Sequence, residues 1–168
     1  MIENGFYKIK QEYYELIGKL GGIYKDNKTR PIFCCIEDNK YSGLFWAIPT
    51  SDYSHRTPEQ KNKYEKYNSL GKKDIRYAWY FVGHTNIEAV YRISSCLPIT
   101  DKYIECPYIS QGIHLILKNR ADISTIRNKL GIILITEKKY PNKYEQHITD
   151  IKEYLIKELQ TKGSPKNW

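Results

Sequence analysis

Two short runs of β-branched and aromatic residues, separated by a polar turn, most constrain what this chain can fold into. Ile32–Ile36 is typical of a buried strand, Leu44–Ile48 is its expected partner, and Asp38-Asn39-Lys40 supplies turn residues between them. Pro49 follows, and since proline cannot donate to a sheet ladder we expect the second strand to end there. The pattern predicts an antiparallel hairpin that delivers residues 50–56 to the mouth of a strand.

The rest of the chain adds further strands without a helix after each one. Helical periodicity or end signals predict helices over Lys10–Leu20, from Thr57 to about Asn68, from Asp122 to Tyr140 and from Tyr144 to about Gln160, and a turn or single helical turn over Pro98–Ile104. Further strands are predicted over Phe6–Ile9, Ile75–Val82, Ala89–Ile93 and Ile113–Leu117. Because the order is not βαβ, we expect an α+β domain with a curled, mostly antiparallel sheet.

The length of 168 residues fits one domain, which we place at residues 1–160 with a tail at 161–168. No stretch approaches the roughly 20 apolar residues of a membrane span, and the acidic, polar N-terminus does not resemble a signal peptide. Cys34 and Cys35 are adjacent and should point to opposite faces of a strand, and no C-x-x-C spacing occurs. We interpret the cysteines as reduced core and near-core thiols of a cytoplasmic protein.

The charge of the chain indicates a polyanionic partner. Its formal net charge is +8, and it has sixteen tyrosines against four phenylalanines. Lysines and tyrosines interleave on the helix that follows the capping box Thr57-Pro58-Glu59-Gln60. Aromatic faces stack on unpaired bases while ammonium groups meet phosphates, so this composition favours RNA over DNA or a membrane. Candidate RNA contacts are Arg30, Lys61, Lys63, Tyr64, Lys66, Lys72 and Lys73. A ribosomal or membrane-surface protein, or a merely solvated lysine-rich face, would share this balance.

A set of catalytic residue types lies just beyond the predicted hairpin. Thr50 and Ser51 follow Pro49, and His55 and Arg56 come a few residues later. An imidazole that titrates near neutrality can transfer protons, while hydroxyls and a guanidinium can hold phosphate oxygens. His84, between two predicted strands, is a second candidate for proton transfer. The alternative interpretation is an ordinary polar turn.

Four sequence blocks, taken in order, resemble a known family. They are Arg30-Pro31-Ile32-Phe33, Phe45–Ser51, Glu88–Ile93 and Leu97–Ile104. Together they resemble the protein toxins of type III toxin–antitoxin systems, the ToxN/AbiQ relatives, and most closely the CptN and TenpN branches. The resemblance covers roughly residues 6–160.

The resemblance implies a compact, mostly antiparallel β-barrel of the MazF/Kid toxin type with added helices. It also implies a metal-independent endoribonuclease that leaves 2′,3′-cyclic phosphate and 5′-hydroxyl ends and needs no cofactor. Such toxins cut cellular RNA and their own antitoxin RNA precursor. The processed, pseudoknotted antitoxin RNA then inhibits the toxin in a closed protein–RNA assembly, and such systems often defend bacteria against phage.

The resemblance assigns only part of the candidate site. ToxN-type members carry Thr-Ser followed, after a proline, by a lysine that is important for activity. Here Thr50 and Ser51 match, whereas residues 52–56 contain neither proline nor lysine. The roles of His55 and Arg56 therefore rest on their chemistry alone.

Two other classes of protein stay open. A non-catalytic RNA-binding module would explain the charge and the aromatic residues without an acid or a base. A metal-dependent nuclease is less favoured, because the acidic residues are scattered along the sequence and form no carboxylate cluster.

Overall fold

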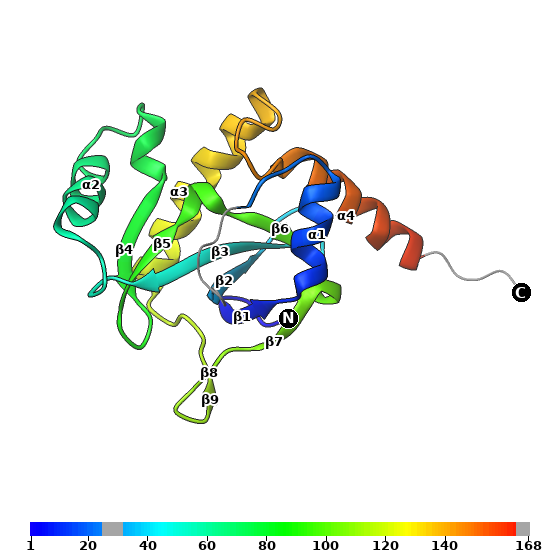
Figure 1. Cartoon of the computed structure of the whole chain (residues 1–168), viewed down its shortest axis with the longest axis horizontal. Coiled ribbons are helices and arrows are strands. Elements are labelled where there is room, and N and C mark those ends of the chain that lie inside the picture. Colours follow the sequence, from blue (N-terminus) through cyan, green and yellow to red (C-terminus); the bar gives the residue numbers. More distant parts are fainter. Residues whose placement is uncertain (25–31, 164–168) are drawn as a thin grey trace, which may run out of the picture.

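The computed structural model describes residues 1–24 and 32–163, and its elements are arranged as in Figure 1. One seven-stranded sheet contains β1 (Gly5–Ile9), β2 (Ile32–Glu37), β3 (Phe45–Asp52), β4 (Tyr80–His84), β5 (Glu88–Arg92), β6 (Leu97–Ile99) and β7 (Ile104–Pro107). A separate hairpin contains β8 (Ile109–Ser110) and β9 (Ile113–His114). The helices are α1 (Gln11–Lys19), α2 (Pro58–Asn68), α3 (Arg120–Lys139) and α4 (Ile148–Gly163), with 3₁₀ turns η1 (Ile75–Ala78), η2 (Ile93–Ser95) and η3 (Asp101–Tyr103).

The seven strands are paired in the order β4-β5-β3-β2-β1-β7, and β6 also pairs with β3. Every pairing between them is antiparallel, which confirms the expected α+β architecture with a mostly antiparallel sheet. Within the described residues, no strand pairing joins β4 to β7, so the path is open at its two ends.

The predicted central hairpin is confirmed, but its second strand does not end at Pro49. The β2–β3 register runs from Ile32 opposite Thr50 to Glu37 opposite Phe45, so β3 continues through the proline. On its other edge, β3 pairs with β6 over Phe45–Ala47 and with β5 over Thr50–Asp52. Pro49 falls in the gap between these two partners, where the missing N–H costs no ladder hydrogen bond.

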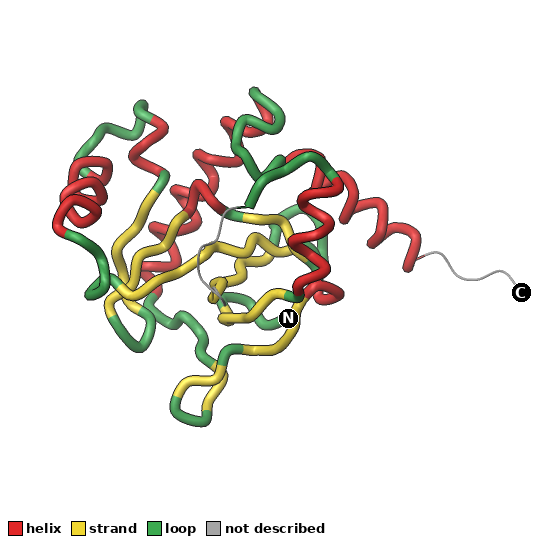
Figure 2. The backbone as a smooth tube through the Cα atoms, in the orientation of Figure 1, coloured by secondary structure: helices red, strands yellow, loops and turns green. Residues whose placement is uncertain are grey.

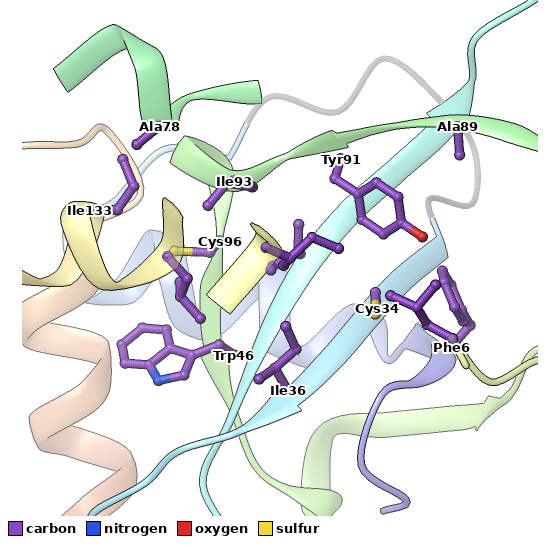
Figure 3. Close-up of a cluster of buried hydrophobic side chains, with 14 of the residues drawn as sticks. Phe6, Cys34, Ile36, Trp46, Ala78, Ala89, Tyr91, Ile93, Cys96 and Ile133 are labelled. Carbon is purple, nitrogen blue, oxygen red and sulfur yellow. The ribbon is translucent and has the colours of Figure 1, made fainter. Parts of the chain in front are cut away.

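The sheet separates two hydrophobic cores. The helices that cover the sheet are red in Figure 2 and its strands are yellow. One core contains Cys34 and Trp46 and is covered by α3 (Figure 3), and the other contains Cys35 and is covered by α1 and most of α4. The adjacent cysteines therefore point to opposite faces, as predicted. Cys34, Cys35 and Cys96 are buried with free thiols, whereas Cys106 is exposed rather than near the core. Burial raises the pKa of the Cys96 thiol to about 12, so this thiol stays protonated and unreactive.

Two predicted strands require correction. Residues 75–78 form η1 rather than a strand, because the Asp74 carboxylate accepts a hydrogen bond from the Arg76 amide and caps a 3₁₀ turn. The strand begins only at Tyr80. In the predicted strand Ile113–Leu117, only the first two residues pair with β8. Leu115 and Leu117 donate instead to the carbonyls of Tyr108 and Asn4, so this segment changes its partner along its length.

The helices begin and end where their capping residues lie. The predicted capping box at Thr57 is present at the start of α2. Asn119 is the N-cap of α3, so this helix begins at Arg120, two residues before the expected start at Asp122. Tyr144 lies outside α4, because His147 has a positive φ of 56° and interrupts the helical path. α4 continues to Gly163, beyond the expected boundary at residue 160, and the rest of the predicted tail lies outside the described residues. Among the described helices, none has the length and apolar character needed to cross a membrane.

One buried cation joins α2 to the body of the protein. Lys129 of α3 is 3% exposed, and its ammonium donates to the Asn68 side chain at the end of α2. It also donates to the carbonyl oxygens of Tyr77 and Tyr80, both at 2.8 Å. Burial lowers the pKa of Lys129 to about 8. A charged group from a distant part of the sequence therefore helps to hold α2 beside the sheet.

We expect Lys129→Met to lower the free energy of unfolding by about 2 kcal/mol or more at pH 7, because three buried acceptors lose their donor. The gap between wild type and variant should widen as pH rises from about 8 to about 10, by on the order of 3 kcal/mol. The sign follows from proton binding: in that window the unfolded lysine keeps a proton that the folded one has lost. Urea unfolding of both proteins across this range measures the gap, and a gap that is constant with pH would contradict the lowered pKa.

Candidate active site

The end of β3 meets the β4–β5 hairpin at one corner of the sheet. Asp52 pairs with Ala89, which in turn pairs with Gly83. One residue further on, the amide of Tyr53 donates to the carbonyl of Glu88 at 3.1 Å, and Glu88 pairs with His84. These two rows of paired residues across β3, β5 and β4 bring residues 50–56 and His84 to the same corner, although they are distant in the sequence.

The two hydroxyls at this corner have different environments. Thr50 Oγ1 donates to the carbonyl of Ile32 on the neighbouring strand at 3.0 Å. Ser51 Oγ is buried and has no hydrogen-bond partner among residues 1–24 and 32–163. A buried hydroxyl without a partner costs about 1–3 kcal/mol, so the protein retains Ser51 at some cost in stability.

The turn after β3 is organised by a carboxylate. Asp52 Oδ1 accepts from the Ser54 hydroxyl at 2.6 Å and from the Ser54 amide at 2.8 Å. These hydrogen bonds, the hydroxyl first, hold the pKa of Asp52 below its ordinary value. The ring of His55 is 74% exposed with Nδ1 3.9 Å from Asp52 Oδ2, and Arg56 Nε donates to the Asp52 carbonyl at 3.3 Å. The turn therefore presents an imidazole and a guanidinium to solvent.

The second histidine is held by a carboxylate from α3. The amide of His84 donates to Asp122 Oδ2 at 3.1 Å, and the same oxygen lies 4.0 Å from His84 Nδ1. The ring of His84 is 71% exposed. Gly83 makes this approach possible, since a Cβ there would lie 3.0 Å from Asp122 Oδ2 and 2.4 Å from the Phe81 ring. Both histidines thus have a carboxylate near Nδ1 and an exposed ring.

Tyr53 and His84 lie in the same row of paired residues. Tyr53, two residues before His55, and His84 have Glu88 of β5 between them. Two inter-strand spacings separate the backbones of Tyr53 and His84 by about 10 Å.

The predicted RNA contacts divide into three groups. Lys61 lies over the Tyr53 ring at 4.8 Å, which connects α2 to the turn, while Lys63 lies over Tyr67 and Tyr80. Lys66, Lys72 and Lys73 are exposed. Tyr64 is 5% exposed and packs on Tyr80 with ring centroids 4.8 Å apart, so its ring supports the position of α2 rather than a base. Arg30 lies outside the described residues.

Sequence reasoning missed several residues at this corner. Asp122 supports His84 from a helix that begins far along the chain, and no local pattern indicates this contact.

A cavity of about 70 Å³ beside the corner is lined in part by Thr50, Asp52, Asn86 and Tyr108. At about 30 Å³ per water it holds roughly two waters, so a nucleobase would have to bind on the surface outside it.

No protein-family model matches this chain, and no curated protein is significantly similar to it. Among the described residues, no group of three or more His, Cys, Asp or Glu side chains lies close enough together to hold a metal ion.

We expect opposite effects on stability from two adjacent substitutions. Ser51→Ala removes a buried hydroxyl without a partner and should raise the free energy of unfolding by about 1 kcal/mol. Thr50→Ala removes the bond to the Ile32 carbonyl and should lower it by about the same amount. Urea unfolding at pH 7 measures both, with Thr50→Ser as the control that keeps the hydroxyl. A loss of stability in Ser51→Ala would mean that this hydroxyl has a partner in solution.

Proposed function

We propose that this protein is a metal-independent endoribonuclease, the toxin of a type III toxin–antitoxin system. The observation that carries the proposal is that strand pairing through β5 puts the end of β3, with Thr50 and Ser51 and the turn that carries His55 and Arg56, at the same corner of the sheet as His84, and that both histidine rings are exposed. The lysines of α2 flank this corner, and Lys61 reaches the turn itself. Proton-transfer groups and phosphate-binding groups are the two parts that RNA cleavage without a metal requires.

In the proposed reaction the 2′-hydroxyl of a nucleotide attacks its own phosphate. One histidine takes the proton of this hydroxyl, and the 2′-oxygen forms the new bond to phosphorus. The bond from phosphorus to the 5′-oxygen breaks, and the other histidine gives that oxygen a proton. The products are a 2′,3′-cyclic phosphate and a 5′-hydroxyl. Each histidine has Nδ1 facing a carboxylate, Asp52 or Asp122, which leaves Nε2 for the RNA.

The phosphate gains negative charge in the transition state. Arg56 donates to the Asp52 carbonyl and Lys61 of α2 lies over the Tyr53 ring, and we assign these two cations to the non-bridging oxygens. Ser51 Oγ is buried and bonds to no described residue. If substrate binding uncovers it, this hydroxyl would donate a hydrogen bond to the same non-bridging oxygens.

The family assignment rests on the order of four sequence blocks that resemble ToxN/AbiQ relatives. A strongly antiparallel sheet with helices on both faces is compatible with a barrel of the MazF/Kid type. On this proposal the protein acts in the bacterial cytoplasm and contributes to phage defence. Its partners are cellular RNA and a pseudoknotted antitoxin RNA, which it cuts from a precursor and which inhibits it in a closed assembly.

A non-catalytic RNA-binding module is the alternative, and the exposed lysines of α2 would serve it equally well. Incubation of the purified protein with a long RNA in EDTA separates the two functions. We expect cleavage that continues in EDTA and leaves 2′,3′-cyclic phosphate ends, identified by their resistance to ligation and by mass. Binding without cleavage would support the module, and cleavage abolished by the chelator would indicate a metal-dependent nuclease.

Single substitutions of the two histidines test their assignment. His55→Ala and His84→Ala should each lower the single-turnover cleavage rate by about 10²-fold or more and change RNA affinity little, because proton transfer belongs to the transition state.

His147→Ala provides the matched control for this experiment. His147 forms an i,i+3 pair with Asp150 at 3.5 Å, as His55 does with Asp52, but it lies at the start of α4. Its removal should leave the rate unchanged. If His55→Ala cleaves RNA at the wild-type rate, another group transfers the proton that we assign to His55.

A further inference from the structure

The β8–β9 hairpin is a tight, preorganised projection. Its two turn residues, Gln111 and Gly112, both have positive φ, 51° and 78°, which is the geometry of a type I′ turn. Such a turn matches the twist of the strands that it joins, so the hairpin leaves the body of the protein in one direction (Figure 1).

The base of this hairpin is anchored to two other parts of the protein. His114 Nε2 lies 3.0 Å from the Phe6 carbonyl, and the Phe6 amide donates to the Leu115 carbonyl at 3.0 Å. Asn86 Nδ2, in the β4–β5 turn, donates to Ser110 Oγ at 2.9 Å. The hairpin is therefore fixed to β1 and to the turn that follows His84.

The hairpin exposes apolar side chains that the fold does not use. Ile113 is 73% exposed and Ile109 is 51% exposed, and Ile87 in the adjacent β4–β5 turn is 47% exposed. Exposed aliphatic groups on a rigid projection favour a partner with a flat apolar surface. The neighbouring charges favour an anionic one, since Lys118 and Arg120 follow the hairpin and are both exposed.

The hairpin adjoins the candidate active site. Tyr108 and Leu115, at its base, line the same small cavity as Thr50 and Asp52. The bond between Asn86 and Ser110 places the hairpin beside the β4–β5 turn, two residues from His84. Ser110 shares its face of the hairpin with Ile113, so the bond to Asn86 brings that face towards the β4–β5 turn.

We propose that the β8–β9 hairpin is an RNA wedge, in which Ile113 inserts between the bases that flank the cleaved bond. Ile113 shares its face of the hairpin with Ser110, whereas Ile109 lies on the opposite face with His114. This inference rests on the proposed endoribonuclease function. Attack by the 2′-oxygen requires it to stand in line with the departing 5′-oxygen, and a stacked A-form strand does not provide that alignment. An aliphatic side chain inserted at a base step unstacks it, and the backbone can then turn into line.

The test compares stacked with unstacked RNA. With wild-type protein, binding to an RNA that carries 2-aminopurine beside the mapped cleavage site, with a 2′-deoxy group that prevents attack, should raise the fluorescence as the base unstacks. Ile113→Ser should lose this rise. Its single-turnover cleavage should fall about 10-fold or more in adenosine-rich RNA, which stacks strongly, and much less in uridine-rich RNA.

Ile135→Ser is the matched control, because Ile135 on α3 is also 73% exposed. It should leave fluorescence and cleavage unchanged. Equal cleavage of both RNAs by wild type and Ile113→Ser would overturn the wedge and leave the proposed function intact, whereas absence of cleavage by wild type would overturn the function itself. A concentration-dependent dimer of wild type that Ile113→Ser abolishes would instead assign the hairpin to self-association and overturn the wedge.

Discussion

The pairing of β3 on both edges is the constraint on which the rest of the structure depends. One edge pairs with β2 along its length, and the other pairs first with β6 and then with β5. Pro49 marks the change of partner, because no ladder bond is needed at that position. A shift of one residue would move Cys34 and Cys35 to the wrong cores, so packing and pairing select the same register.

The candidate site is a product of this register rather than of a deep cleft. Its members stand where strands end, on turns whose backbone groups are bonded by Asp52 and Asp122. The histidines are exposed, while the Ser51 hydroxyl is buried and bonds to no other part of the chain that the structure describes. Chemistry on a long polymer suits such an arrangement, since a polymer cannot enter a small enclosed cavity and must lie across the surface.

Local features were predictable from the sequence, and features made by distant contacts were not. The β2–β3 hairpin and the capping box at Thr57 each depend on a few adjacent residues. The meeting of His84 with residues 50–56 depends on pairing across three strands, and the support from Asp122 depends on where α3 docks. Composition also misled at residues 75–78, where the Asp74 cap outweighs the β propensity of the aromatic run.

The buried ammonium of Lys129 has a consequence for the order in which the protein assembles. Its bond to Asn68 joins residues 61 positions apart, so this part of the docking of α2 forms only once α3 has reached the sheet. The packing of Tyr64 and Tyr67 on Tyr80 joins residues that are closer in the chain and does not involve α3. In the native protein an opening of α3 therefore removes one anchor from the end of α2 and leaves its aromatic contacts in place.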